Sequence, residues 1–115
     1  MERIWEFKTA KFVVTCEVEP EMDSDLSWAD AETLDNIARG VYGNYCFAAK
    51  VYRVCDAGFE HEIAADYLGN SVYADPTEFV REHIGLAAQR RADGIHYGCY
   101  FLDMVREAIS AARKN

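Results

Sequence analysis

Hydrophobic and polar positions alternate along residues 11–19, KFVVTCEVE. Alternate side chains of an extended chain point to opposite faces, so this pattern predicts a strand. One face carries Phe12, Val14, Cys16 and Val18, and the other carries Val13, Thr15, Glu17 and Glu19. The strand is expected to end at Pro20, which has no N–H to donate. Trp5 and Phe7 begin the same strand or form an earlier one joined to it near Thr9.

A second pair of strands is predicted around the turn Asp56-Ala57-Gly58. Residues 44–55 and 59–68 are rich in aromatic and β-branched side chains and flank this turn, which is typical of a β-hairpin. Gly58 occupies the position that is expected to need positive φ. The residues Gly69-Asn70-Ser71 are expected to break the second strand.

A short helix is predicted over residues 28–39. Ser27 is the expected N-cap, Asp30 the acid of a capping box, and Gly40 the residue that ends the helix. Its apolar side chains are Trp28, Ala31, Leu34, Ile37 and Ala38.

Two more helices are predicted in the second half of the chain. Asp75, Pro76 and Glu78 form a helix start, followed by inward-facing Phe79, Val80, His83, Ile84 and Ala87 and then by a loop at residues 90–94. The last helix has the clearest periodicity, because its apolar residues recur every three or four positions: Phe101, Met104, Val105, Ala108, Ile109 and Ala112.

This order of elements predicts an α+β fold. Strands that follow each other through tight turns pair antiparallel, so we expect a small curved antiparallel sheet of three to four strands with helices packed on one face. The 115 residues, half of them hydrophobic, are enough for a single domain.

The N-terminal residues do not have the order of a signal peptide, and no apolar run reaches the length of a membrane span. These features predict a cytoplasmic protein that does not enter a membrane. The four cysteines, Cys16, Cys46, Cys55 and Cys99, are therefore expected to be reduced and buried. The spacing of His96 and Cys99 is only a weak zinc signal, so we expect no metal and no cofactor.

No catalytic motif is present in the sequence. His61, His83 and His96 lack a recognisable catalytic setting, and neither a phosphate-binding glycine loop nor a nucleophile motif occurs. Asp23 and Asp25 have the spacing of calcium ligands, but the glycine that a calcium loop needs is missing. The sequence therefore favours a protein that is not an enzyme.

Charge is distributed very unevenly along the chain, whose net charge is −8. Residues 1–38 hold ten carboxylates against three basic residues, whereas residues 39–115 hold ten against nine. Residues 12–38 contain no lysine or arginine but hold the eight acids that we take as the candidate partner-binding residues: Glu17, Glu19, Glu21, Asp23, Asp25, Asp30, Glu32 and Asp35.

The first five of these acids occupy every second position and would share one side of an extended chain, like the phosphates of a nucleic-acid strand. Such a run suits a basic partner and argues against direct binding of nucleic acid. The alternative is that the acids form a solvated face and serve solubility alone.

Three segments of the chain resemble small proteins encoded by bacteriophages and prophages of proteobacteria. They are the opening WEFKTAKFVV, the central DYLGNSVYADPTEFVREHIG and the closing CYFLDMVREAISAAR. Acidic phage proteins of this size include inhibitors of bacterial immunity, such as anti-CRISPR proteins that occupy basic nucleic-acid-binding surfaces.

This resemblance implies an inhibitor of a host defence protein or CRISPR effector complex that has a basic surface. CRISPR effectors hold nucleic acid in positively charged channels, which an acidic protein would complement. The alternative is a small phage accessory or assembly module that binds through an apolar surface, for example as a homodimer.

Overall fold

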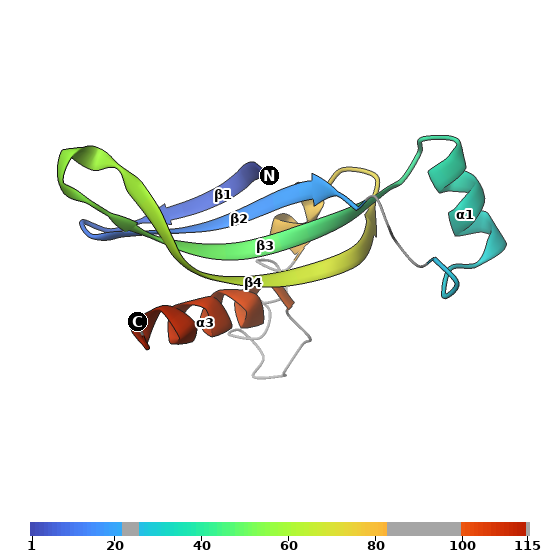
Figure 1. Cartoon of the computed structure of the whole chain (residues 1–115). Coiled ribbons are helices and arrows are strands. Elements are labelled where there is room, and N and C mark those ends of the chain that lie inside the picture. Colours follow the sequence, from blue (N-terminus) through green and yellow to red (C-terminus); the bar gives the residue numbers. More distant parts are fainter. Residues whose placement is uncertain (22–25, 83–99, 115) are drawn as a thin grey trace, which may run out of the picture.

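The computed structural model describes residues 1–21, 26–82 and 100–114, and it confirms the predicted α+β class (Figure 1). Four antiparallel strands form one sheet in sequence order: β1 (Glu2–Lys8), β2 (Phe12–Pro20), β3 (Gly43–Val54) and β4 (Glu60–Tyr73). The helices include α1 (Ala31–Ala38) and α3 (Tyr100–Arg113), and residues 78–82 are also helical. The residues before Thr9 form a separate strand, so β1 and β2 are a hairpin.

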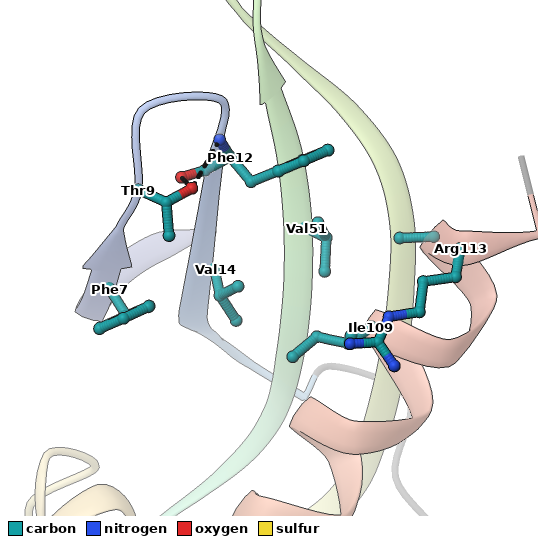
Figure 2. A pocket seen from close by; sticks show the side chains of 8 residues that line it. Phe7, Thr9, Phe12, Val14, Val51, Ile109 and Arg113 are labelled. Carbon is teal, nitrogen blue, oxygen red and sulfur yellow. Dashed lines mark hydrogen bonds between the residues drawn. The ribbon is translucent and has the colours of Figure 1, made fainter.

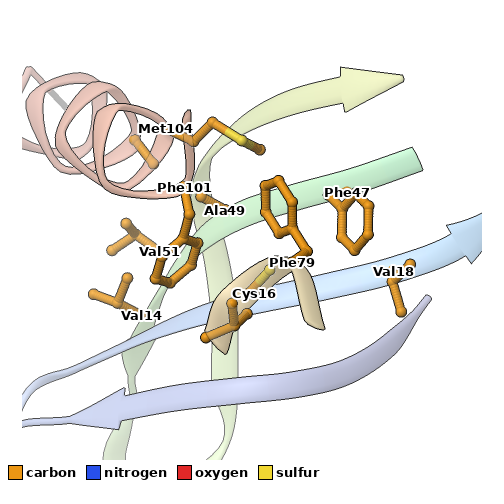
Figure 3. Packing of buried hydrophobic residues seen from close by; sticks show 11 residues of the cluster. Val14, Cys16, Val18, Phe47, Ala49, Val51, Phe79, Phe101 and Met104 are labelled. Carbon is orange, nitrogen blue, oxygen red and sulfur yellow. The ribbon is translucent and has the colours of Figure 1, made fainter. Parts of the chain in front are cut away.

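One face of the sheet carries the hydrophobic core (Figure 3). Phe47 of β3 stacks on Phe79 with ring centroids 4.0 Å apart, and Trp5 of β1 meets Phe101 of α3 edge-on at 5.0 Å. The predicted inner face of α3 is confirmed, because Phe101, Met104 and Ala108 are buried and Val105, Ile109 and Ala112 pack against the core. Of the earlier predicted helix, Phe79 and Val80 are buried, whereas His83, Ile84, Ala87 and the loop at 90–94 lie outside the described residues.

The prediction for the first helix was wrong about its start. Asp30, rather than Ser27, is the N-cap, and its carboxylate accepts the backbone N–H of Thr33 at 2.8 Å. Gly40 follows the helix with φ of 77°, as expected of the residue that ends it. No residue of α1 is buried, because α1 stands beyond the end of the sheet and away from the helix-covered face (Figure 1).

The predicted break at Gly69-Asn70-Ser71 was also wrong, because β4 continues through these residues to Tyr73. Tyr45 pairs with Ser71 and Phe47 with Leu68, so two residues of β4 lie opposite one residue of β3. Asn70 adopts φ of 51°, and the pair Gly69-Asn70 forms a β-bulge. The glycine and asparagine allow a local irregularity, but the hydrogen-bonded ladder continues on both sides of it.

The turn between β3 and β4 lies where the sequence placed it, at Asp56–Gly58. Its geometry differs in one respect, since Ala57 (φ 73°) and Gly58 (φ 81°) both have positive φ. A side chain in this region is strained, so Ala57 is a local source of instability.

The sheet curls across the face opposite the core. β1 and β4 are its two edge strands, yet Arg3 Nη1 of β1 lies 3.2 Å from Glu60 Oε1 of β4. Bulges accompany this curvature, because the register shifts between Arg3 and Trp5 in β1 and again opposite Val51 and Tyr52. The curl shields side chains that an open sheet face would leave in water.

Candidate functional site

The predicted acids do not form one continuous row in the structure. Glu17 is only 6% exposed, whereas Glu19 at the end of β2 is exposed and Glu21 is partly exposed. Asp23 and Asp25 lie outside the described residues. The surface acids of β2 therefore begin at Glu19, and Glu17 belongs to a different environment inside the curl of the sheet.

The remaining three acids lie on a projecting segment, residues 26–42, which we call the acidic arm. Asp30 caps α1, and Glu32 and Asp35 are exposed on it. Asp35 lies 3.5 Å from Arg39, the one basic residue of the arm. Within the arm, the chain that follows α1 folds back on the helix, because the backbone N–H of Val41 donates to Asn36 O at 2.9 Å.

The acidic arm also exposes large apolar side chains. Trp28 is 56% and Leu34 42% exposed, and Val41 and Tyr42 are exposed as well. Exposed tryptophan and tyrosine side chains are frequent anchors of protein–protein interfaces, so the arm combines negative charge with residues suited to binding.

A groove of about 660 Å³ separates the arm from the end of β4 and the helical residues that follow. Aromatic residues Trp28, Tyr42 and Tyr73 line it together with Glu78 and Glu82. Burial raises the pKa of Tyr73, and the charges of Glu82 and Glu78 raise it further. The groove is therefore aromatic, and its negative charge lies on the side formed by residues 78–82, across from the arm.

Inside the curl, a buried polar cluster surrounds Glu17. Thr15 Oγ1 donates a hydrogen bond to Glu17 Oε2 at 2.8 Å, and the hydroxyl of Tyr52 donates another to the same oxygen. Lys50 Nζ lies 3.7 Å from Glu17 Oε1 and 3.1 Å from Glu62 Oε1. The guanidinium of Arg3 covers the ring of Tyr52, 5.1 Å from its centroid.

The contacts in this cluster fix the protonation states of its members. Burial acts to raise the pKa of Glu17, but hydrogen bonds from Tyr52 and Thr15 and the charge of Lys50 together hold it below its usual value. Burial raises the pKa of Tyr52, and so does its hydrogen bond to Glu17. Because the carboxylate stays ionised and the phenol stays protonated at neutral pH, neither is poised for proton transfer there. The role of the cluster is therefore structural: its hydrogen bonds and ion pairs hold the curled sheet together.

Sequence reasoning missed this cluster because it assigned Glu17 to a solvated row of acids. Thr15, Glu17, Lys50 and Tyr52 alternate on their strands, and the alternation places them on the face opposite the core. Only the register brings them together, with Thr15 opposite Lys50.

The cysteines differ in exposure. Cys16 is buried, and burial raises the pKa of its thiol to about 12. Cys46 is half-buried, and Cys99 lies outside the described residues. Cys55 is exposed at the end of β3, so the expectation that it is buried was wrong. Within residues 1–21, 26–82 and 100–114, no three histidine, cysteine or acidic residues are arranged to hold a metal ion.

Comparison with known proteins gives no relative for this chain. No protein-family model, curated protein or solved structure matches it. Among the helices in the described part of the chain, none has the length and apolar character needed to cross a membrane.

Proposed function

We propose that this protein is a non-enzymatic, phage-encoded inhibitor that binds a basic surface of a bacterial defence complex through the acidic arm. The observation that carries the proposal is a projecting, unburied helix that presents acids beside exposed anchor residues. Residues 19–42 hold seven carboxylates and a single basic residue, Arg39. A surface of this charge is attracted to a basic partner and repelled by nucleic acid.

The kind of partner follows from charge and from the resemblance to phage proteins. A CRISPR effector complex holds nucleic acid in a basic channel, and an acidic arm inserted there would compete with the nucleic acid. The exposed Trp28 and Leu34 support the contact, because charge steers association while buried apolar anchors supply much of the affinity.

The same apolar side chains favour a second candidate function, an accessory or assembly module that binds an apolar partner surface or a second copy. In that case the acids of the arm would serve solubility. The two functions differ in which side chains carry the binding energy, so substitutions separate them.

The test is a charge reversal confined to exposed acids of this region, Glu19, Glu32 and Asp35, each changed to lysine. Asp30 is spared because it caps α1. A matched control reverses three exposed acids that lie outside the acidic arm, Asp56, Asp103 and Glu107. Both variants change the net charge equally, so a general effect of charge on solubility or on nonspecific binding appears in both.

Partners captured from a proteobacterial host are purified, and their binding of nucleic acid is measured with each variant and with wild type. We expect the wild type to inhibit nucleic-acid binding, less so as salt is added, and the arm variant to bind more than about tenfold more weakly than the control. Equal binding by the arm and control variants would contradict the charge-based function. Loss of binding in Trp28→Ala/Leu34→Ala together with that equality would favour the apolar module.

A further inference from the structure

Eight side chains drawn in Figure 2 line an apolar pocket of about 320 Å³. The elements that border it lie at the end of the molecule away from the acidic arm (Figure 1). The pocket lies between the β1–β2 hairpin and the last turns of α3. Its lining is almost entirely hydrophobic, with two polar members at the edge: Phe7, Phe12, Val14, Val51, Ile109, Ala112, Thr9 and Arg113. Phe7 is 58% and Phe12 38% exposed, so two large aromatic side chains at its border are left in water.

The two polar residues at the edge differ in what they offer a ligand. Thr9 is already engaged, because its Oγ1 bonds with both the backbone carbonyl and the N–H of Phe12, at 3.2 and 3.1 Å. Arg113 forms no ion pair with any of the described residues. Figure 2 shows its side chain running beside Ile109 at the edge of the pocket.

The basic side chains that have no ion pair among the described residues gather near the pocket. Ten basic side chains lie in the described residues, and six of them form ion pairs there: Arg3, Lys8, Arg39, Lys50, Arg81 and Arg106. The other four, Lys11, Arg53, Arg113 and Lys114, all occur at this end. Lys11 precedes the pocket residue Phe12, Arg53 pairs with Phe12 in the sheet, and Lys114 follows Arg113.

We propose that this pocket binds a small amphiphilic anion, with an apolar chain among Val14, Val51 and Ile109 and a carboxylate at Arg113. A guanidinium presents paired donors that match a carboxylate, and unpaired basic side chains around it add attraction. The volume is at the small end of ligand pockets, about 300–1,000 Å³, which suits a single chain. This site is separate from the acidic arm, and the proposal does not depend on the proposed function.

The test uses decanoate below its micelle-forming concentration as the probe, with methyl NMR of the full-length protein as the readout. Decanol has the same chain without charge, and decyltrimethylammonium carries the opposite charge. We expect decanoate to shift the methyl signals of Val14, Val51 and Ile109 in a saturable way. Decanol should bind more weakly, and the cation more weakly still.

Two substitutions locate the anion-binding group. Arg113→Gln should weaken decanoate binding about fivefold, as expected for a partly solvent-screened ion pair, and should remove the preference for decanoate over decanol. Arg106→Gln on the same helix is the matched control, because Arg106 pairs with Asp103 and does not line the pocket. It should leave decanoate binding unchanged.

Ala112→Phe is a second probe, because a larger side chain at this lining position should occupy the pocket and abolish binding of all three ligands. Folding of each variant is checked by its backbone NMR spectrum. Equal affinity for decanoate and decanol would overturn the proposal, as would saturation that leaves the pocket methyls unshifted. Association with phosphatidylglycerol vesicles without binding of free decanoate would also overturn it, because it would indicate a membrane-surface contact in place of a ligand pocket.

Discussion

Removing the hydroxyl of Tyr52 deletes a single oxygen atom, yet it is expected to lower the free energy of unfolding substantially. Tyr52→Phe takes away one hydrogen bond to Glu17, whose side chain is 8% exposed, so water has little access to replace it. A hydrogen bond to a buried charged group contributes about 1.5–3 kcal/mol. We therefore expect the free energy of unfolding to fall by about 2 kcal/mol.

The assay is urea unfolding followed by circular dichroism at neutral pH, with Tyr67→Phe as the matched control. Tyr67 lies on the same face of the sheet in β4, is 57% exposed, and makes no hydrogen bond through its hydroxyl within the described part of the chain. The control should change stability by less than about 0.5 kcal/mol. A double-mutant cycle with Glu17→Gln isolates the interaction between the two side chains.

The same measurements across acidic pH check the electrostatic reasoning. The pKa of Glu17 is lowered in the folded protein, so its contribution to stability is present above the pKa of the unfolded chain and is lost as pH falls through the folded value. Tyr52→Phe removes one cause of the lowering, so its stability should depend less on pH in that range. A stability loss no larger than that of Tyr67→Phe, with no coupling in the cycle, would refute the structural role of the cluster.

Two further substitutions test the fold. Ala57→Gly should stabilise the protein by about 1 kcal/mol, since it relieves a non-glycine residue at φ of 73°, and a lower urea midpoint than wild type would contradict the turn geometry. Phe101→Ala should cost about 3–5 kcal/mol, since Phe101 is fully buried between Trp5 and Phe79; a loss below about 1 kcal/mol in the same assay would show that α3 does not close the core.

Much of the fold was predictable because the local pattern of apolar residues agrees with which side chains are buried in the structure. The apolar spacing in α3 matches the side chains that pack on the sheet, and the turn at Asp56–Gly58 joins the strands predicted on either side. The bulge at Gly69-Asn70 was not predictable, because the same two residues suit a turn. Because β4 pairs with β3 on both sides of these residues, they form a bulge and not a turn.

The candidate site was less predictable, because burial in this fold depends on distant segments. The sequence predicted the helix that became α1, but not that none of its residues is buried or that Trp28 and Leu34 are exposed. Glu17 belongs to a polar alternation that normally marks a solvated face. It is buried because the sheet curls and brings Glu60 of one edge to Arg3 of the other, and that contact spans 57 positions.

Because Glu17 is separate from the other acids, the charge-reversal experiment can distinguish a loss of binding from a loss of folding. If the reversed acids had included Glu17, the polar cluster would have been disturbed, and the two losses could not have been told apart. Glu19, Glu32 and Asp35 lie outside the cluster, so their reversal should leave the free energy of unfolding nearly unchanged. The pocket at Arg113 lies at the opposite end of a molecule that measures 50 Å in its longest dimension. Failure of either proposal therefore leaves the other standing.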